Sequence, residues 1–304
     1  MNIIIDENDT GQRTDIFLSK ILPDISRSKI QNGIKTGAVK VNGNIIKSSY
    51  KLKEDDELVF DDKDFTNSIK IEPENIPLEI VWEDENMTVI NKPSGMLTHP
   101  TSTENTNTLV NALLYKYGEN LSDKSGAFRR GIVHRLDKNT SGLIMIAKNN
   151  KTHEYLEEQI KLRNFKKIYR AIVKGVIEED YLEINSPIGR NPNNPIKMGI
   201  VDGGKESLSL VRVIERFKDT THIEVELVTG RTHQIRVHLS SINHPIYNDT
   251  LYGFGKPKIK TQEQVLQSCK LEFLKPFSDK VISLEIPPDE DFVKVVNSIT
   301  VAAK

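Results

Sequence analysis

The stretch GIVHRLDKNTSGLIMIAKN, residues 131–149, joins a polar segment to an apolar run. The apolar half, SGLIMIAK, predicts a β-strand. Just before it, Asp137 lies among His134, Arg135 and Lys138. An opposite charge within ~4–6 Å lowers the pKa of a carboxyl group by ~1–3 units, so we expect Asp137 to be ionised. An ionised, oriented carboxylate can act as a nucleophile or as a base.

A second polar segment offers a counter-ion for this carboxylate. In TGRTHQIRVH, residues 229–238, Arg231 follows Thr229 and Gly230 at the end of a predicted strand. A guanidinium can hold a carboxylate through two hydrogen bonds and remains charged. On chemistry alone, Asp137 and Arg231 could equally be a structural ion pair or two charges on surface loops.

Length and composition indicate an ordinary globular protein. The chain has 304 residues, of which 37% are hydrophobic and 28% charged, enough for one large or two smaller domains. The first residues lack the basic start and apolar stretch of a signal peptide, and we expect no membrane-spanning helix. Cys269 is the single cysteine, so an internal disulfide is impossible. These features predict a cytoplasmic protein.

Positive charge is clustered although the net charge is only −1. Every charged residue from 26 to 53 is Lys or Arg, and a second basic region runs from 124 to 170. Clusters of this kind predict surfaces for polyanions, although a charge run is often only solvated surface.

Several common enzyme classes lack their sequence motifs in this chain. There is no HxxxH or HExxH pair for a metal, and no phosphate-binding GxxxxGK[ST] or GxGxxG loop. A nucleophile elbow, GxSxG, is also absent. We therefore expect a reaction that uses no metal and no cofactor.

Residues 12–61 have the pattern of a small separate unit. RTDIFLSKIL carries Ile16, Phe17, Ile21 and Leu22 at helical spacing, and Ser26 could cap a second helix at residues 26–37. AVKVNGNII predicts a hairpin whose turn is Asn-Gly, and DELVF predicts a closing strand. The unit resembles an S4-type RNA-binding module. The matching residues are Arg13, Asp15, Ser26, Arg27, Ile30, Gly37, Val39, Val41, Asn42 and Gly43.

The rest of the chain is predicted to be one larger domain. We place an S4-like domain at residues 1–62, a polar linker at 63–75 and the second domain at 76–304. Strands are expected at residues 77–84, 87–93, 141–148, 169–175, 208–217 and 222–230. Helices are expected at residues 107–118, 151–162 and 231–242. Because strands and helices do not alternate regularly, we predict an α+β fold with a mixed, mainly antiparallel sheet and flanking helices.

Four segments resemble, in order, the motifs of the RluA-type pseudouridine synthases, specifically the RluC and RluD branch of ribosomal RNA enzymes. They are VINKPSGMLTHP (residues 89–100), HRLDKNTSG (134–142), FKKIYRAIVKG (165–175) and LVTGRTHQIRVHLSSINHPIYNDTLYG (227–253). The resemblance implies that Asp137 is the nucleophile and Arg231 its ion-pair partner. It also implies that Tyr169 stacks on the target base and could assist proton removal.

The same resemblance implies a substrate. Such an enzyme converts uridine to pseudouridine in RNA, with large-subunit (23S) ribosomal RNA favoured and transfer RNA left open, and the target uridine must be unstacked or flipped out. We expect a monomer that binds RNA through basic residues near Asp137 and in the S4-like domain, with His134 as a structural or RNA-contacting residue. The candidates are Arg27, Lys29, Lys35, Lys40, Arg129, Arg130, His134, Arg135 and Lys138.

Two positions depart from the family pattern. Asn248 occupies the place of a usual glycine, and LQSCKLEFLKPF, residues 266–277, lacks the family's histidines. Two other functions also compete with the synthase. A non-catalytic RNA-binding assembly factor could use the same basic surfaces, although a negative charge at Asp137 would then hinder RNA binding. A carboxylate-dependent hydrolase or glycosidase would usually need a second acid, which the HRLD segment does not offer.

Overall fold

The computed structural model describes residues 1–23, 25, 27–61, 71–101, 104–255, 259, 261 and 263–302. The chain divides into two compact units, Met1–Lys70 and Ile71–Lys304, here called the N-terminal and C-terminal units. Most of the predicted linker lies outside the described residues. Its last part contacts the C-terminal unit, since the Asn111 side chain donates a hydrogen bond to the Glu72 carbonyl at 2.8 Å. The boundaries predicted after residues 62 and 75 remain predictions.

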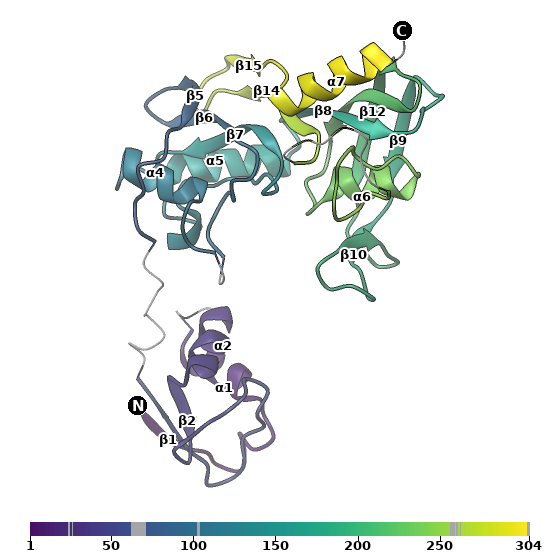
Figure 1. Ribbon diagram of the computed structural model, residues 1–304. Coiled ribbons are helices and arrows are strands. Elements are labelled where there is room, and N and C mark those ends of the chain that lie inside the picture. The colour runs from purple at the N-terminus through teal and green to yellow at the C-terminus, as the bar shows by residue number, and fades with distance from the viewer. Residues whose placement is uncertain are drawn as a thin grey trace. The chain divides into compact units, whose positions relative to one another are not determined.

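The N-terminal unit packs two helices against a small antiparallel sheet (Figure 1). Of the predicted apolar set, Phe17 and Leu22 are buried, whereas Ile16 and Ile21 are exposed and Leu18 is buried instead. Asp15 is also buried and, with Arg13 and Arg27, forms a charged cluster. The elements are β1 (Asn2–Ile4), α1 (Thr14–Ile21), α2 (Arg27–Thr36), β2 (Val39–Val41), β3 (Asn44–Ile45) and β4 (Glu57–Phe60), with strand order β1-β4-β2-β3.

The predicted hairpin of this unit is present. Strands β2 and β3 pair on either side of Asn42 and Gly43, whose φ angles of 51° and 76° are the left-handed values that a tight two-residue turn requires. Ser26, the predicted helix cap, lies outside the described residues.

The C-terminal unit is built on a nine-stranded sheet, counted over the described part of the chain. The strand order is β5-β6-β7-β14-β8-β13-β12-β9, and β15 pairs with β14. Each pairing in this sheet is antiparallel except that between β14 and β7. The strands are β5 (Glu79–Glu83), β6 (Met87–Lys92), β7 (Ser141–Ala147), β8 (Lys166–Lys174), β9 (Tyr181–Asn185), β12 (Leu208–Arg216), β13 (Thr220–Leu227), β14 (Leu266–Leu274) and β15 (Val281–Glu285).

Helices cover the two faces of this sheet. Helix α7 (Glu290–Ala302) packs Phe292 and Val295 against Ile172 of β8. Helix α6 (Gln234–Ser241) lies on the other side of the strands, as Figure 1 shows. Helices α4 (Leu109–Tyr117) and α5 (Asn150–Lys161) accompany the β5–β7 half, and β10 (Ile188–Arg190) and β11 (Met198–Ile200) form a separate hairpin.

Gly142 allows the one parallel pairing of the sheet. A Cβ atom on Gly142 would lie 2.2 Å from the carbonyl oxygen of Ser268 on β14, and the φ of Gly142 is 110°. Only glycine permits so close an approach of two backbones at this φ.

The observed elements confirm the α+β prediction. The sequence patterns did not reveal β9–β11, β14, β15 or α7, and they began α6 three residues too early.

Candidate active site

Asp137 lies in a loop that two other segments hold in place. The loop runs between a 3-10 turn, η1 (Ala127–Arg129), and β7. Leu136 exchanges two hydrogen bonds with the Thr98 hydroxyl, at 2.8 and 3.3 Å. The Ser94 hydroxyl donates to the Asn139 carbonyl at 3.0 Å. The segment after β6 therefore fixes the backbone on both sides of Asp137.

Lys92 completes this support from inside the protein. Its side chain is fully buried, and its ammonium donates to the carbonyls of Pro93 and Met96 at 2.8 Å and of Lys138 at 3.2 Å. Burial lowers the pKa of Lys92 to about 7, while the charge of Asp137 opposes that shift. Lys92 thus joins the end of β6 to the residue that follows Asp137.

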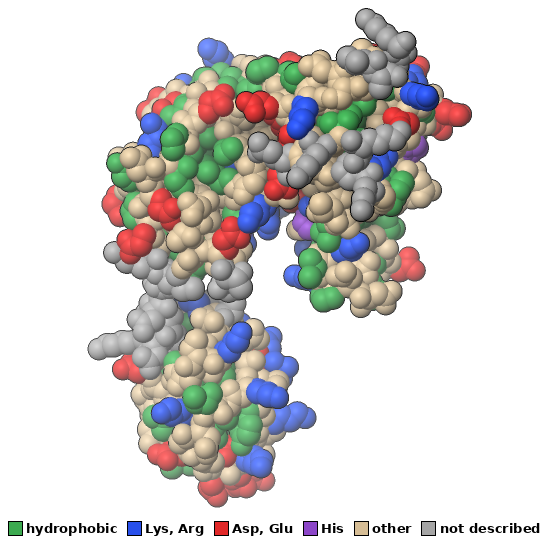
Figure 2. Space-filling view, viewed as in Figure 1, with side chains coloured by type: hydrophobic (Ala, Val, Ile, Leu, Met, Phe, Trp, Pro, Cys, Tyr) green, Lys and Arg blue, Asp and Glu red, His purple; other side chains and the backbone are tan. Residues whose placement is uncertain are grey.

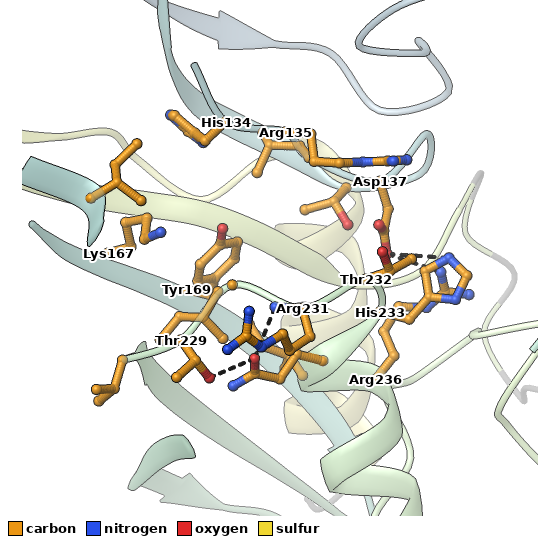
Figure 3. Close-up of a pocket in the computed structure, with 18 of the residues that line it drawn as sticks. His134, Arg135, Asp137, Lys167, Tyr169, Thr229, Arg231, Thr232, His233 and Arg236 are labelled. Atoms are coloured by element: carbon orange, nitrogen blue, oxygen red, sulfur yellow. Dashed lines mark hydrogen bonds and ion pairs between the residues drawn. The ribbon is translucent and has the colours of Figure 1, made fainter. Parts of the chain in front are cut away.

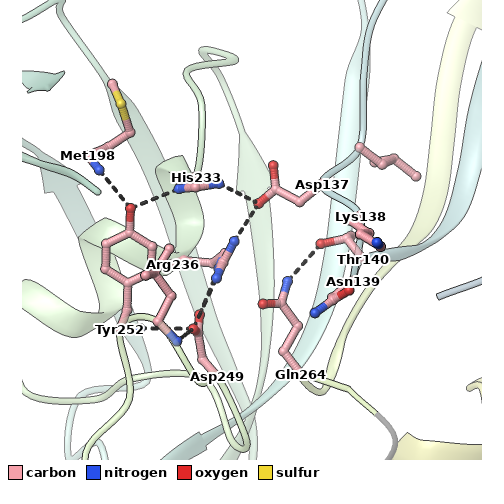
Figure 4. A network of polar contacts seen from close by, with 12 residues as sticks. Asp137, Lys138, Asn139, Thr140, Met198, His233, Arg236, Asp249, Tyr252 and Gln264 are labelled. Atoms are coloured by element: carbon pink, nitrogen blue, oxygen red, sulfur yellow. Dashed lines mark hydrogen bonds and ion pairs between the residues drawn. The ribbon is translucent and has the colours of Figure 1, made fainter. Parts of the chain in front are cut away.

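Arg236 binds the Asp137 carboxylate. Its Nη1 lies 3.0 Å from Asp137 Oδ2, while its Nε and Nη2 donate to the two oxygens of Asp249 at 2.7 and 3.0 Å (Figure 4). Asp249 is completely buried. Burial acts to lower the pKa of Arg236, but the hydrogen bond and charge of Asp249, together with Asp137, raise it above its ordinary value. The guanidinium is therefore a permanent bridge between two carboxylates.

His233 approaches the same oxygen of Asp137. Its Nε2 lies 3.9 Å from Asp137 Oδ2, and its Nδ1 is 2.8 Å from the hydroxyl of Tyr252, which itself accepts a hydrogen bond from Met198 N (Figure 4). This arrangement favours a Tyr252 hydroxyl that donates to Nδ1, with the hydrogen of His233 on Nε2. Burial lowers the pKa of His233, and the charge of Asp137 opposes this.

Arg231 does not form the predicted ion pair with Asp137. Its Nε donates to the Glu206 carbonyl at 3.0 Å, and its backbone N–H donates to the side-chain oxygen of Gln234 at 3.0 Å. Among the described residues, Arg236 makes that ion pair instead. The physical reason is local: α6 begins at Gln234, which places Arg236 on its first turn beside Asp137, whereas Arg231 lies in the preceding loop.

A cavity of about 470 Å³ opens beside Asp137. Figure 3 shows Asp137, Tyr169 and Arg231 around it, so the structure brings the three predicted site residues to one cavity although it changes the ion-pair partner. Tyr169, on β8, is 5% exposed. Burial raises the pKa of the Tyr169 hydroxyl, which disfavours the phenolate and hence a role as a base. The Tyr169 side chain lines the cavity.

Comparison with known proteins identifies this arrangement. The family described as RNA pseudouridylate synthase matches residues 86–241, and the S4 domain family matches residues 12–58. This chain belongs to the RNA pseudouridylate synthase family.

Individual relatives agree over nearly the whole chain of this pseudouridine synthase. Ribosomal large subunit pseudouridine synthase D of Pseudomonas aeruginosa is 39% identical over 93% of this chain and 90% of its own. The protein of the same name from Neisseria meningitidis serogroup B is 37% identical, over 96% and 80%. The solved structure of human RNA Pseudouridylate Synthase Domain Containing 1 has a TM-score of 0.58 at 23% identity, covering 74% of this chain and 95% of that chain, and shows the same fold.

The RNA-binding candidates near Asp137 have different surroundings. Arg129 and Arg135 are exposed, and Lys138 is exposed beside Glu104 at 2.8 Å. Arg130 forms an ion pair with Glu119 at 3.1 Å. These side chains remain accessible to a polyanion, because exposed ion pairs exchange partners at little cost.

His134 is instead part of the framework of the synthase. Its Nε2 accepts a hydrogen bond from Met145 N at 3.0 Å, and burial lowers its pKa to about 3. A neutral, hydrogen-bonded ring of this kind fits the structural role that we expected as one of two possibilities.

The candidates of the N-terminal unit lie on its surface. Lys29, Lys35 and Lys40 are exposed, and Figure 2 shows several Lys and Arg side chains on the visible face of this unit. Arg27 is half-exposed and donates to the buried Asp15 at 3.0 Å. Arg27 therefore also helps to hold the unit together, whatever it contributes to RNA binding.

The departure at Asn248 has a local explanation. The φ of Asn248 is 61°, a left-handed value that favours glycine and that asparagine tolerates best among other residues. Its side-chain amide donates to the Thr261 hydroxyl at 2.5 Å. The replacement therefore keeps the turn that presents Asp249 to Arg236.

Several residues of the site were missed in the sequence. Arg236 and His233 stand in the same motif as Arg231, but the motif alone does not show which side chain faces Asp137. Asp249 and Tyr252 follow in the same segment, and their role depends on a turn that brings them back to α6. In the described part of the chain, no helix is long and apolar enough to cross a membrane.

Proposed function

We propose that this synthase converts uridines of large-subunit ribosomal RNA to pseudouridine, with Asp137 as the nucleophilic carboxylate. The observation that carries the proposal is the Arg236–Asp137 ion pair at 3.0 Å on the wall of the 470 Å³ cavity. The RNA class is supported by relatives named ribosomal large subunit pseudouridine synthase D, at 37–39% identity.

Only one oxygen of Asp137 is engaged in the free protein. The contacts with Arg236 and His233 both involve Oδ2, and no described residue makes a hydrogen bond or ion pair with Oδ1. Oδ1 is therefore the oxygen that would react with the nucleoside. Three steps suit it: attack at sugar C1′, attack at base C6, or removal of a sugar proton to form a glycal. In each case Arg236 holds the carboxylate in position.

The remaining chemistry is a rotation of the detached base. Uracil leaves through N1, turns, and rejoins the sugar through C5, after which the C5 proton is lost. The target uridine must leave its stack to reach Asp137, at a cost of a few kcal/mol that is smallest in loops. Tyr169 offers a flat ring for the base during this rotation, and Arg231 is placed to contact RNA at the cavity wall.

The exposed basic residues are proposed to bind phosphates. Arg129, Arg135 and Lys138 flank the site, and Lys29, Lys35 and Lys40 would add affinity from the N-terminal unit with little dependence on sequence. Arg27, Arg130 and His134 are secondary in this proposal, because each already has a partner within the protein. We also propose a monomer that acts in the cytoplasm.

The test is modification of unmodified ribosomal RNA by the purified full chain. Pseudouridines are mapped by chemical labelling and primer extension. We expect one or a few sites in large-subunit RNA for the wild type and none for Asp137→Asn, which should bind RNA normally. Asp123→Asn, the same change at an exposed aspartate, is the matched control.

The result separates the proposal from a purely RNA-binding role. If the wild-type chain binds ribosomal RNA but modifies no uridine, an assembly factor becomes the better description. If Asp137→Asn modifies RNA as fast as wild type does, the assignment of the nucleophile is wrong.

A further inference from the structure

Lys167 is a largely buried lysine in the wall of the active-site cavity, and its ammonium has no partner among the described residues. Its residue is 9% exposed, and no described side chain or carbonyl makes a hydrogen bond or ion pair with its ammonium. Its neighbours on β8 differ: Lys166 faces Glu226 at 3.5 Å, and Arg170 donates to the Ile286 carbonyl at 3.0 Å. The side chain is largely buried, but its ammonium is not among the fully buried atoms that lack a partner and so reaches the cavity, where a ligand can supply the missing acceptor.

The position of Lys167 favours a contact with the target base over a contact with the RNA backbone. Lys167 and Tyr169 are two residues apart on one strand, so both side chains face the cavity, and Figure 3 shows Lys167 beyond the Tyr169 ring from Asp137. A base that stacks on Tyr169 with its sugar near Asp137 would extend toward Lys167. Lys161 and Arg163 line the same cavity and are exposed, so they can bind RNA phosphates without a contribution from Lys167.

The surroundings leave room for such a contact. A Cβ atom on Gly230 would lie 3.8 Å from the Lys167 ammonium, and glycine leaves that space open. Burial lowers the pKa of Lys167, and its charge adds to the burial that lowers the pKa of His134. An oxygen acceptor would relieve the burial of the charged form.

We propose that Lys167 donates a hydrogen bond to a carbonyl oxygen of the target uracil, which makes it a substrate-binding residue of the synthase. The inference rests on the proposed function. An ammonium is only a donor, so it can donate to the uracil carbonyl at C4 and is repelled by the amino group that cytosine carries there. When the N1–C1′ bond breaks, negative charge spreads over N1 and the two carbonyls, and a nearby ammonium stabilises that charge.

Two substitutions on the same strand test the contact. Lys167→Met removes the charge and keeps the length, and Lys166→Met is the control on the opposite face of β8. The substrate is a synthetic hairpin around a mapped target uridine. We expect Lys167→Met to lower the single-turnover rate by about 10- to 150-fold, as for the loss of one charged hydrogen bond. RNA affinity, its salt dependence and the rate of Lys166→Met should stay near wild type.

The folded state provides a second readout. Because Lys167→Met removes a charge that has no acceptor among the described residues and sits on a largely buried side chain, the Tm of the free protein should stay equal or rise while activity falls. A lower Tm would mean that the ammonium is already satisfied in the free protein, and would overturn the proposal.

Substrate analogues test the same contact in the wild-type chain. The hairpin is made with 4-thiouridine or 2-thiouridine at the target, because sulfur is a weaker acceptor than oxygen. One of the two should slow the wild type, identify the carbonyl, and have little further effect on Lys167→Met. Full additivity of both analogues with the substitution would refute the contact.

Other outcomes distinguish the possible failures. A uniform loss of affinity in Lys167→Met, with a salt slope smaller by about 0.7–0.9, would assign the residue to a phosphate instead. Normal turnover by Lys167→Met with inactive Asp137→Asn would refute this inference alone. A wild-type chain that modifies no RNA would refute the proposed function and the inference with it.

Discussion

Substituting the two arginines of the TGRTHQIRVH segment tests the geometry of the site most directly. Arg236→Lys keeps the charge but replaces a planar group with a point charge. Arg236 makes one contact with Asp137 and two with the buried Asp249, and a single ammonium cannot reproduce all three. We expect the lysine to stay with Asp249 and release Asp137.

The size of the effect follows from the lost contact. One hydrogen bond between charged groups contributes about 1.5–3 kcal/mol, and each ~1.4 kcal/mol changes a rate tenfold. The single-turnover rate of pseudouridine formation should therefore fall by about 10- to 150-fold. The control is Arg231→Lys, because a lysine can still donate to the Glu206 carbonyl, and its rate should stay within about threefold of wild type.

The assay uses excess protein over the RNA hairpin, so that RNA affinity does not limit the rate. It is run well below the Tm of each variant, because the buried Asp249 loses part of its hydrogen bonding in Arg236→Lys. A larger loss for Arg231→Lys than for Arg236→Lys would show that the guanidinium bound to Asp137 during the reaction is not the one that binds it in the free protein.

Two further predictions concern stability. Asp15→Asn removes the buried carboxylate that the partly exposed Arg13 and Arg27 bind, and should destabilise the N-terminal unit by about 1.5–3 kcal/mol, as for the loss of hydrogen bonds to a charged group. Circular dichroism should detect this, while the fluorescence of the single tryptophan, Trp82 in the C-terminal unit, keeps its unfolding midpoint. His134 has a pKa lowered to about 3, so unfolding binds protons between pH 6.5 and 3 and stability falls as pH falls. From pH 8 to pH 5 His134 should contribute about 2 kcal/mol to the loss of stability, in addition to the losses from His99 and His222, whose pKa values burial also lowers. His134→Gln should lose correspondingly less than wild type, whereas equal losses would contradict the assignment.

The sequence predicted which segments contribute residues to the site better than it predicted which side chains contact each other there. Strand and helix patterns predicted the α+β class, and the motifs brought Asp137, Tyr169 and one arginine of the correct segment to the same cavity. They could not choose between Arg231 and Arg236. That choice depends on where α6 begins, which is set by a left-handed His233 (φ 56°) and by the buried hydrogen bonds of Gln234.

Long-range pairings were also out of reach. Strand β14 joins the two halves of the sheet and pairs in parallel with β7, which lies more than a hundred residues earlier, at the close approach that Gly142 permits. No local pattern encodes such a register. Asp249 was missed for a related reason, since its partner Arg236 is found only once the turn at Asn248 is known.

The two buried lysines of the site illustrate how contacts separate support from substrate binding. Lys92 is completely buried and Lys167 largely so, and burial lowers the pKa of each. The Lys92 ammonium donates its three hydrogens to backbone carbonyls. It therefore has no donor left for a substrate, and its hydrogen bonds fix the Asp137 loop. Lys167 has no such acceptor among the described residues and lines the cavity. Removing the Lys92 charge should therefore lower the stability of the protein. Removing the Lys167 charge should lower the reaction rate and leave the fold intact, because Lys167 gains its acceptor only when the substrate is bound.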